Sequence, residues 1–139
     1  MKLFLSALLL FFLTSCLSDS EYVPNPPAPV VKSTKYYVHK SVTKKNGVIT
    51  FTTLHDGTCT AKSYYQIDQL NGSSEVIFVS YSTCDSYQIL KGSYSSGNAS
   101  MILNFVIYHA SINGNELTVS KITTDMWDTY EETTIAKSN

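Results

Sequence analysis

The sequence has no arginine and no strong excess of charge of either sign. Its ten lysines are matched by eleven acidic residues, which gives a formal net charge of −1. Arginine is the preferred residue for bidentate contacts to phosphates and bases, and nucleic-acid-binding domains carry a dense positive patch. The closest group of lysines, Lys40, Lys44 and Lys45, leads into a predicted turn, where solvation accounts for it. We therefore expect no nucleic-acid partner.

Long apolar runs are also scarce, and the main one lies at the N-terminus. It extends from Leu3 to Leu13, interrupted only by Ser6, and follows Lys2. A transmembrane helix needs about 20 apolar residues, so this stretch is too short to span a bilayer. A positive charge followed by a short apolar segment is the order found in secretory signals. We expect residues 1–15 to be removed.

Proline is missing from the rest of the chain, because all four prolines lie between Pro24 and Pro29. Clustered prolines favour the extended polyproline II conformation, in which residues 17–31 reach about 45 Å. This segment is predicted to be a spacer, with a proline-rich ligand for a partner's aromatic groove as the alternative. The sequence thus divides into a signal (1–15), a linker (16–31) and a folded domain (32–139).

The signal ends in Leu13-Thr14-Ser15-Cys16. These four residues resemble the lipobox of bacterial lipoproteins, in which an aliphatic residue and two small residues precede a cysteine. The resemblance implies cleavage before Cys16, a diacylglyceryl group on its thiol and a further acyl chain, such as palmitate, on the new amino group. Two or more chains anchor a protein stably. An ordinary signal peptide that happens to end in cysteine is the alternative.

The residue after the cysteine influences sorting in the lipoproteins that this signal resembles. Aspartate there favours retention in the inner membrane, whereas this sequence has Leu17. The resemblance therefore implies an outer-membrane lipoprotein of the bacterial envelope. We expect its periplasmic face rather than the cell surface, although Asp19 and Glu21 loosely resemble surface-export signals.

Cysteine is rare, and once Cys16 is assigned to lipid, Cys59 and Cys84 remain. The envelope outside the cytoplasmic membrane permits disulfides, and a small domain gains stability from one. Closing a loop of this length contributes roughly 3.5 kcal/mol in the chain-entropy description. A metal ligand or a reactive thiol would need a partner at characteristic spacing. We predict a Cys59–Cys84 disulfide.

The folded region is rich in Ser, Thr, Tyr, Val and Ile, and Asn-Gly occurs three times in it. Asn-Gly is a strong hairpin signal because both residues tolerate the positive φ of a type I′ turn. The three pairs are Asn46-Gly47, Asn71-Gly72 and Asn113-Gly114. We predict an all-β fold with seven or eight antiparallel strands. A small barrel is preferred to a sandwich because consecutive hairpins and a closing strand leave fewer open edges.

Apolar residues alternate with polar ones between these turns, which predicts a sheet with one buried face. Ile49 and Phe51 are expected to share a face. The strongest single strand is predicted from alternating apolar residues, namely Met101, Leu103, Phe105 and Ile107.

Three further segments give more specific expectations. Val76–Val79 is apolar throughout and is predicted to be covered on both sides. Leu117 and Val119 begin a strand in which Ile122 falls out of phase, which a β-bulge would explain. Asp125–Glu132 is either strand or a short helical turn capped by Thr124-Asp125.

The segment Tyr108–Val119, with a later strand near Tyr130, resembles the closing hairpin of lipocalin-like bacterial lipoproteins. This resemblance implies an alternative function, a carrier of a small apolar ligand. Such a carrier would have an open interior cavity lined by residues such as Phe51, Phe78, Leu103 and Phe105.

The three histidines, His39, His55 and His109, are more than four residues apart. No metal-ligand or catalytic spacing is present, so we expect no metal, no cofactor and no enzymatic activity. An envelope hydrolase is the least favoured alternative, and it would need His55 or His109 within hydrogen-bond reach of a serine and an acid. The acidic residues near Trp127 do not match a calcium loop, and a solvated strand end explains them.

Tyrosine is the one residue type in excess, with ten in the chain. Tyrosine rings pack apolar surface while their hydroxyls reach water, and tyrosine is enriched at binding interfaces. If an adjacent pair lies on a strand, one ring faces inward and the other outward. The possible binding surface comprises Tyr36, Tyr37, Tyr64, Tyr65, Trp127 and Tyr130. The favoured function is a lipid-anchored, non-catalytic β-domain that binds an envelope protein, glycan or other ligand.

Overall fold

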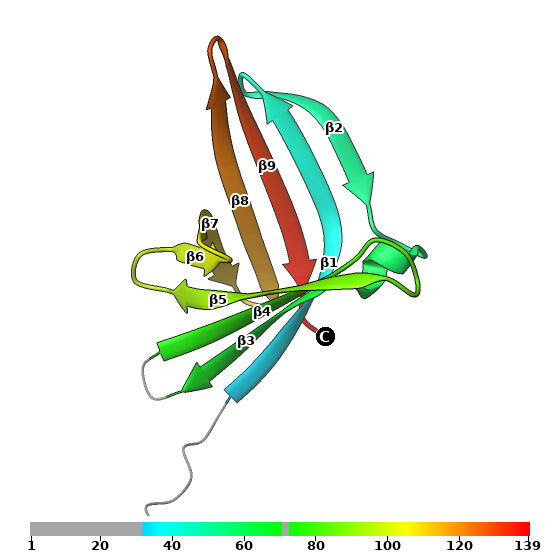
Figure 1. Cartoon of the computed structure of the whole chain (residues 1–139), viewed down its shortest axis with the longest axis vertical. Coiled ribbons are helices and arrows are strands. Elements are labelled where there is room, and N and C mark those ends of the chain that lie inside the picture. The colour runs from blue at the N-terminus through cyan, green and yellow to red at the C-terminus, as the bar shows by residue number, and fades with distance from the viewer. Residues whose placement is uncertain (1–31, 71–72) are drawn as a thin grey trace, which may run out of the picture.

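The computed structural model describes residues 32–70 and 73–139, which form nine strands and one short 3-10 helix (Figure 1). In chain order these elements are β1 (Lys32–Lys45), β2 (Val48–Leu54), η1 (Cys59–Lys62), β3 (Tyr64–Leu70), β4 (Ser73–Tyr81), β5 (Tyr87–Ser95), β6 (Ser100–Leu103), β7 (Val106–Asn113), β8 (Glu116–Asp125) and β9 (Asp128–Lys137). The predicted signal, Cys16 and the linker lie outside the described residues. Within the described residues, no helix is long and apolar enough to cross a membrane.

The strands form a closed antiparallel barrel, as predicted. Strands β3 to β9 each pair with the next strand along the chain, and β9 pairs with β1 to close the ring. Strand β1 is long enough to have two neighbours on one edge, because residues 32–37 pair with β3 and residues 40–45 pair with β2. Eight strands therefore make the barrel, and β2 is an additional strand.

Strands β2, β1, β9 and β8 continue past the barrel body, and we call this extension the upper sheet (Figure 1). It comprises β2, residues 40–45 of β1, 121–125 of β8 and 128–135 of β9. Its two hairpin tips are joined through Asn46, whose side-chain amide donates to Asp128 Oδ1 at 2.9 Å and whose side-chain oxygen accepts from the Thr129 N–H at 2.8 Å. Lys45 adds an ion pair with Asp128 at 2.8 Å.

The barrel interior is filled by side chains from alternate positions of the strands. Met101, Leu117 and Val76 are the largest fully buried side chains. The remaining core residues are Tyr36, Val38, Tyr65, Ile67, Leu103, Ala110, Val119 and Ala136. This interior is a packed core, because these side chains form a single cluster.

Two of the predicted Asn-Gly hairpins can be checked at their turns, and both form. Asn46 and Gly47 have φ of 50° and 80°, as a type I′ turn requires. In the second hairpin Asn113 lies opposite Glu116, so the turn is made by Gly114 and Asn115, one residue later than predicted. Asn71-Gly72 lies outside the described residues, although Leu70 and Ser73 on either side of it are paired.

The prediction of one strand through Met101 to Ile107 is wrong. A tight turn at Asn104 and Phe105, with φ of 43° and 67°, divides this segment into β6 and β7. Leu103 pairs with Val106, which reverses the alternation, so Ile107 lies on the outer face and Phe105 is fully exposed. Positive φ is unfavourable for a bulky aromatic residue, so the sequence carries no ordinary turn signal there.

Three smaller expectations also need revision. The register places Ile49 opposite Lys44 and Phe51 opposite Thr43, so a bulge at Thr50 puts Ile49 and Phe51 on opposite faces. In β8 the pairing with β9 has no bulge, and Ile122 is simply an outward residue. Asp125–Glu132 forms a β-hairpin and no helical turn.

The prediction for Val76–Val79 is confirmed at its two ends. Val76 and Val79 are both buried although three positions apart on β4, which places them on opposite faces. The outer face of β4 is therefore covered at Val79.

Candidate functional site

The two adjacent tyrosine pairs meet across β1 and β3. The antiparallel register sets Tyr36 opposite Tyr65 and Tyr37 opposite Tyr64. Tyr36 and Tyr65 are buried, and the Tyr65 ring stacks on Phe78 at a centroid distance of 4.2 Å. One ring of each pair therefore faces inward and the other outward, as predicted. Tyr36 and Tyr65 belong to the core, so including them in the predicted binding surface was wrong.

The inward tyrosines are held as neutral phenols. Burial raises the pKa of the Tyr65 hydroxyl strongly, and its hydrogen bond with Thr134 opposes this only in part. Burial, with a smaller contribution from Tyr94, also raises the pKa of Tyr36. These two hydroxyls are structural members of the core.

The outward rings extend across four strands of the barrel. Tyr37 lies opposite Tyr64, Tyr64 opposite Val79, and Val79 opposite Ile89, so these side chains form one row on the outer face. Tyr81 and Tyr87 lie opposite each other in the next row. We call this set of residues, Tyr37, Tyr64, Val79, Tyr81, Tyr87 and Ile89, the tyrosine face.

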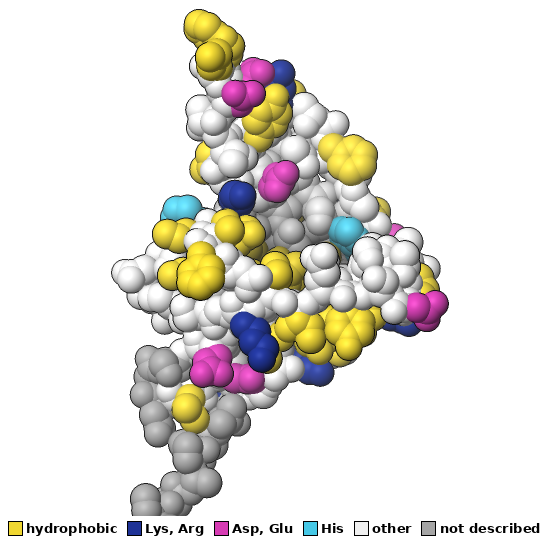
Figure 2. All heavy atoms as spheres, viewed as in Figure 1, with side chains coloured by type: hydrophobic (Ala, Val, Ile, Leu, Met, Phe, Trp, Pro, Cys, Tyr) yellow, Lys and Arg dark blue, Asp and Glu magenta, His cyan; other side chains and the backbone are white. Residues whose placement is uncertain are grey.

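The rings of the tyrosine face contact each other in pairs. Tyr37 and Tyr64 are tilted at a centroid distance of 5.8 Å, and Tyr81 and Tyr87 at 5.4 Å. Tyr37 is 39% exposed and Tyr87 is 55% exposed. Figure 2 shows hydrophobic side chains gathered below β5 on this part of the barrel. The tyrosine face is thus an accessible aromatic surface with Val79 buried at its centre.

A polar row borders the tyrosine face on the side away from η1. Lys35 of β1 lies opposite Gln66 of β3. In the same row, Lys91 of β5 lies opposite Ile77 of β4. The Lys35 ammonium lies over the Tyr64 ring, 4.6 Å from its centroid. Aromatic rings and hydrogen-bonding groups therefore lie on adjacent rows, about 7 Å apart along each strand.

The disulfide between Cys59 and Cys84 is present, as predicted, with a Cα–Cα distance of 4.7 Å. Cys59 begins η1, and Cys84 lies in the loop that joins Tyr81 to Tyr87. This bond therefore ties the loop between two residues of the tyrosine face to the end of the barrel.

The other predicted aromatic residues, Trp127 and Tyr130, lie at the far end of the molecule. Trp127 is 89% exposed in the turn between β8 and β9. Tyr130 lies opposite Lys45, which is eight residues along β1 from Tyr37, or about 26 Å. The predicted binding surface is therefore two separate regions.

Two of the four acidic residues near Trp127, Asp128 and Glu131, are paired with lysines. Asp128 bonds to Lys45 and Asn46, and these bonds lower the pKa of its carboxyl. Glu131 is held by Lys44 at 3.0 Å, which lowers its pKa in the same way. Within the described residues, no three His, Cys, Asp or Glu side chains are grouped so that they can hold a metal ion.

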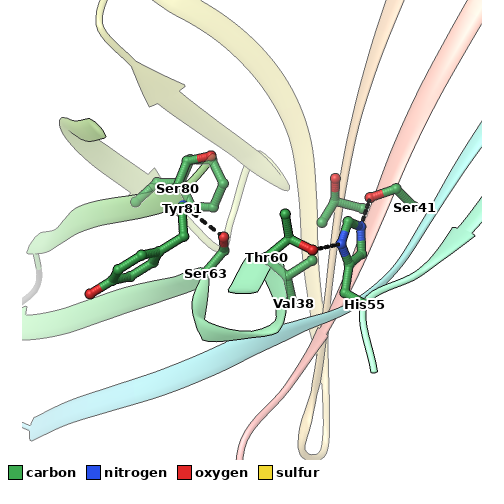
Figure 3. Close-up of a pocket in the computed structure, with 9 residues that line it drawn as sticks. Val38, Ser41, His55, Thr60, Ser63, Ser80 and Tyr81 are labelled. Carbon is green, nitrogen blue, oxygen red and sulfur yellow. Dashed lines mark hydrogen bonds between the residues drawn. The ribbon is translucent and has the colours of Figure 1, made fainter. Parts of the chain in front are cut away.

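A pocket of about 140 Å³ lies at the end of the barrel beside η1 (Figure 3). It is lined by five residues that carry hydroxyl groups, Ser41, Thr60, Ser63, Ser80 and Thr134, together with Val38, His55, Phe78 and Tyr81. Ser63 is buried and accepts a hydrogen bond from the Tyr81 N–H at 2.9 Å.

His55 lies between two hydroxyls in this pocket, as Figure 3 shows. Its Nε2 is 2.9 Å from Ser41 Oγ, and its Nδ1 is 2.9 Å from Thr60 Oγ1. Burial lowers the pKa of His55, with a smaller contribution from His39. A neutral ring fits both contacts if Ser41 donates to Nε2 and Nδ1–H donates to Thr60. This series of hydrogen bonds ends at Thr58, whose hydroxyl is 2.7 Å from that of Thr60.

The Ser41–His55 contact was not predicted from the sequence, because the two residues are fourteen positions apart and meet only through the β1–β2 pairing. The contact supplies a serine and a base, but no acid is among the residues that line the pocket. Thr60 takes the place where a carboxylate would orient the histidine. A histidine within hydrogen-bond reach of a serine is therefore present, but the acid that a hydrolase would also need is not among the residues that line the pocket.

The interior cavity expected for an apolar-ligand carrier does not form from the four predicted residues together, although Phe78 lines the pocket beside η1. Phe51 is 65% exposed on β2, Phe105 is exposed in a turn, and Leu103 is packed in the core. Two cavities among the described residues measure about 140 and 70 Å³. Pockets for drug-sized ligands are typically about 300–1,000 Å³.

In comparisons with known proteins, no family model, no curated protein and no solved structure matches this chain.

Proposed function

We propose that this protein is a lipid-anchored protein of the bacterial envelope whose β-barrel is a non-catalytic binding domain. The observation that carries the proposal is the tyrosine face, on which Tyr37, Tyr64, Tyr81 and Tyr87 point outward from adjacent strands. The lipobox-like Leu13-Thr14-Ser15-Cys16 and the proline-rich linker support the anchored location.

The composition of this surface favours a saccharide as its ligand. Tyrosine rings provide flat apolar surfaces against which the faces of sugar rings pack, and their hydroxyls remain free to hydrogen-bond. Lys35 and Gln66 lie in the next row, where they can reach the hydroxyl or acidic groups of the same sugar. The lysines Lys35 and Lys91 favour a neutral or anionic glycan over a cationic one.

The test is binding of the intact protein to two purified envelope glycans, peptidoglycan and lipopolysaccharide, assayed separately. We expect Tyr37→Ala and Tyr64→Ala each to weaken binding about tenfold, since one stacked ring contributes roughly 1 kcal/mol beyond its buried area. Trp127→Ala is the matched control, because Trp127 is an exposed aromatic residue outside the tyrosine face.

Equal loss of binding in the Trp127 variant would move the site to the other end of the molecule. Binding of neither glycan would reject the saccharide, and mass spectrometry of proteins and lipids captured from the native envelope would then look for a protein partner of the same face. Bound lipid without any partner would favour the carrier alternative.

A hydrolase is the second candidate, because Ser41 and His55 form a hydrogen bond at the edge of a pocket. A neutral histidine can take the serine proton, but no carboxylate among the lining residues stabilises the imidazolium that results. We expect a fluorophosphonate reagent to leave Ser41 unmodified. Labelling that disappears in Ser41→Ala and in His55→Gln would overturn the non-catalytic proposal.

A further inference from the structure

The pocket beside η1 lies on the inner side of the barrel wall, away from the tyrosine face. Phe78 and Ser80 are alternate residues of β4, and the Phe78 ring stacks on the buried Tyr65 ring, so both side chains project inward. Tyr81 belongs to the tyrosine face and follows Ser80 directly, so its side chain projects to the other side of β4. The pocket and the tyrosine face are therefore separate surfaces.

Three serines around the pocket keep hydrogen-bonding capacity that the described residues do not use. The Ser80 hydroxyl has no hydrogen bond to any described residue. Ser63 is 4% exposed, and its Oγ accepts from the Tyr81 N–H, so its own proton remains to be donated. Ser41 donates to His55 Nε2 and keeps its lone pairs. Figure 3 shows Ser63 and Ser80 on one side of the pocket and Ser41 on the other, so a ligand between them meets donors and acceptors.

The volume of the pocket, about 140 Å³, is that of a site for one small ring. Liquid water occupies about 30 Å³ per molecule, and a cavity of about 150 Å³ is large enough to bind benzene. Val38 and Phe78 add apolar surface to the hydroxyl groups of the lining. A ligand that fits this pocket therefore has about the size of a six-membered ring, with polar groups around an apolar face.

The lining favours an uncharged ligand. None of the described residues that line the pocket is Lys, Asp or Glu, and His55 is bonded to a hydroxyl at each ring nitrogen. Two residues from Thr134 on the same face, Glu132 lies opposite Lys121, so these two charges offset each other. An ionised group in the pocket would lose water without gaining an opposite charge. A purely apolar ligand would leave the serine hydroxyls without partners.

An exposed aromatic ring lies next to the pocket. Ser41 and Thr43 are alternate residues of β1 and share one face, and Thr43 lies opposite Phe51 of β2. Phe51 is 65% exposed and lies one row from Ser41, or about 7 Å along the strand. Its ring provides a flat apolar surface for the part of a ligand that extends out of the pocket.

We propose that this pocket is a second ligand site, which binds a single neutral sugar unit. Each sugar hydroxyl can both donate and accept, which matches the unused groups of Ser41, Ser63 and Ser80. The apolar face of the sugar ring packs against Phe78, and Phe51 covers the part outside the pocket. This inference does not rest on the proposed function of the tyrosine face, because the two surfaces lie on opposite sides of β4.

The first test is a ¹H–¹⁵N NMR titration of the full-length protein at neutral pH, in a detergent without a sugar headgroup. We expect glucose to bind with a Kd in the millimolar range, as suits one sugar unit, and to shift the amide signals of Ser63 and Ser80. Glucuronate adds a carboxylate to the same ring, and cyclohexanol is a six-membered ring with one hydroxyl. Each should bind about tenfold more weakly than glucose.

The second test compares variants in the glucose titration. Ser80→Ala should raise the Kd about fivefold, since it removes one hydrogen bond. Phe51→Ala, at an exposed position, should raise it by a similar factor through loss of the stacked ring. Ser120→Ala is the matched control, because Ser120 is also a half-buried serine on a barrel strand but lines the smaller cavity. The control should keep the wild-type Kd.

Tyr37→Ala separates this site from the tyrosine face. It should leave the Kd for glucose unchanged even where it weakens binding of an envelope glycan. Loss of glucose binding in Tyr37→Ala would place the sugar on the tyrosine face and overturn the pocket. Amide shifts that do not saturate with glucose, equal binding of glucuronate or cyclohexanol, or an unchanged Kd in both Ser80→Ala and Phe51→Ala would each overturn it as well.

Discussion

At the scale of single residues, Gly92 lies where two barrel strands approach too closely to leave room for a side chain. This residue lies opposite Leu103 where β5 meets β6. A Cβ atom added at this position would overlap the backbone carbonyl of Ile102. The conformation of Gly92 is not the reason for glycine here, since its φ is not positive. The reason is the close approach of the neighbouring strand.

We therefore expect Gly92→Ala to lower the free energy of unfolding by roughly 3 kcal/mol, the upper end for overpacking in a core. Gly97→Ala is the matched control, because nothing lies within 4 Å of a Cβ at Gly97. The control should change stability by less than about 0.5 kcal/mol. Urea unfolding of both variants measures the difference, and equal stability of the two would contradict this account of the β5–β6 contact.

His55 gives the protein a pH-dependent component of stability. Its pKa in the folded state lies below the ordinary value of 6.5, so the unfolded chain binds more protons between these two values. The contribution is complete above pH 6.5 and is lost as the pH falls from 6.5 towards the pKa of the folded state. Protonation of Nε2 also removes the acceptor for the Ser41 hydroxyl.

We expect His55→Gln to flatten the dependence of the melting temperature on pH below 6.5. It should also cost about 1–2 kcal/mol at neutral pH through its two lost hydrogen bonds. His109→Gln, an exposed position on β7, serves as the control and should keep the wild-type slope. Thermal melts at a series of pH values distinguish the two, and an unchanged slope in His55→Gln would assign the effect to another group.

At the scale of elements, η1 and the loop after β4 are joined by the disulfide. The helix has a single turn and contacts both β1 and β4, and the 82–86 loop is exposed. Neither segment has a buried apolar side chain of its own. The Cys59–Cys84 bond thus adds a covalent link between the two segments at this end of the barrel.

Replacing both cysteines by serine should lower stability by roughly 3 kcal/mol, as expected for a cross-link between residues 25 positions apart. It should also weaken ligand binding, because the loop joins Tyr81 and Tyr87 of the tyrosine face. Denaturant unfolding and the glycan assay give the two readouts. Full binding in the double variant would place the ligand on the Tyr37 and Tyr64 side alone.

Hairpins show where element-level prediction from sequence works. Asn46-Gly47 adopts the predicted turn because both residues accept positive φ at low cost. The turn at Asn104-Phe105 could not be predicted, because phenylalanine opposes positive φ and the alternating pattern continues through it. There the pairing of β6 with β5 and β7 overrides the local preference of the chain.

At the scale of the whole molecule, the proposed anchor and the tyrosine face belong to different parts of the chain. The predicted linker of residues 16–31 precedes Lys32 in the sequence, and Lys32 begins β1, which also carries Tyr37. A spacer of about 45 Å would let the barrel stand clear of lipid headgroups. In the proposed arrangement, the outer surface of the barrel would be accessible to other components of the envelope.

If lipid alone holds the protein, Cys16→Ala should move it from the membrane to the soluble fraction. Leu17→Ala is the control, because it leaves the cysteine intact. Fractionation followed by immunoblotting measures the distribution. Continued membrane association of Cys16→Ala would show that another surface of the protein binds the membrane.

The sequence by itself determined the all-β class, the preference for a barrel, the disulfide and the inward and outward split of the tyrosine pairs. Each of these depends on local chemistry: strand propensity, the period of two, turn residues and a pair of cysteines. Only the tertiary structure decided which strands are neighbours. It brought Tyr37 beside Tyr64, joined Ser41 to His55, separated Trp127 from the tyrosine face and left β2 with an open edge. These relations depend on the register between strands that are distant in sequence, and an alternating pattern is compatible with many registers.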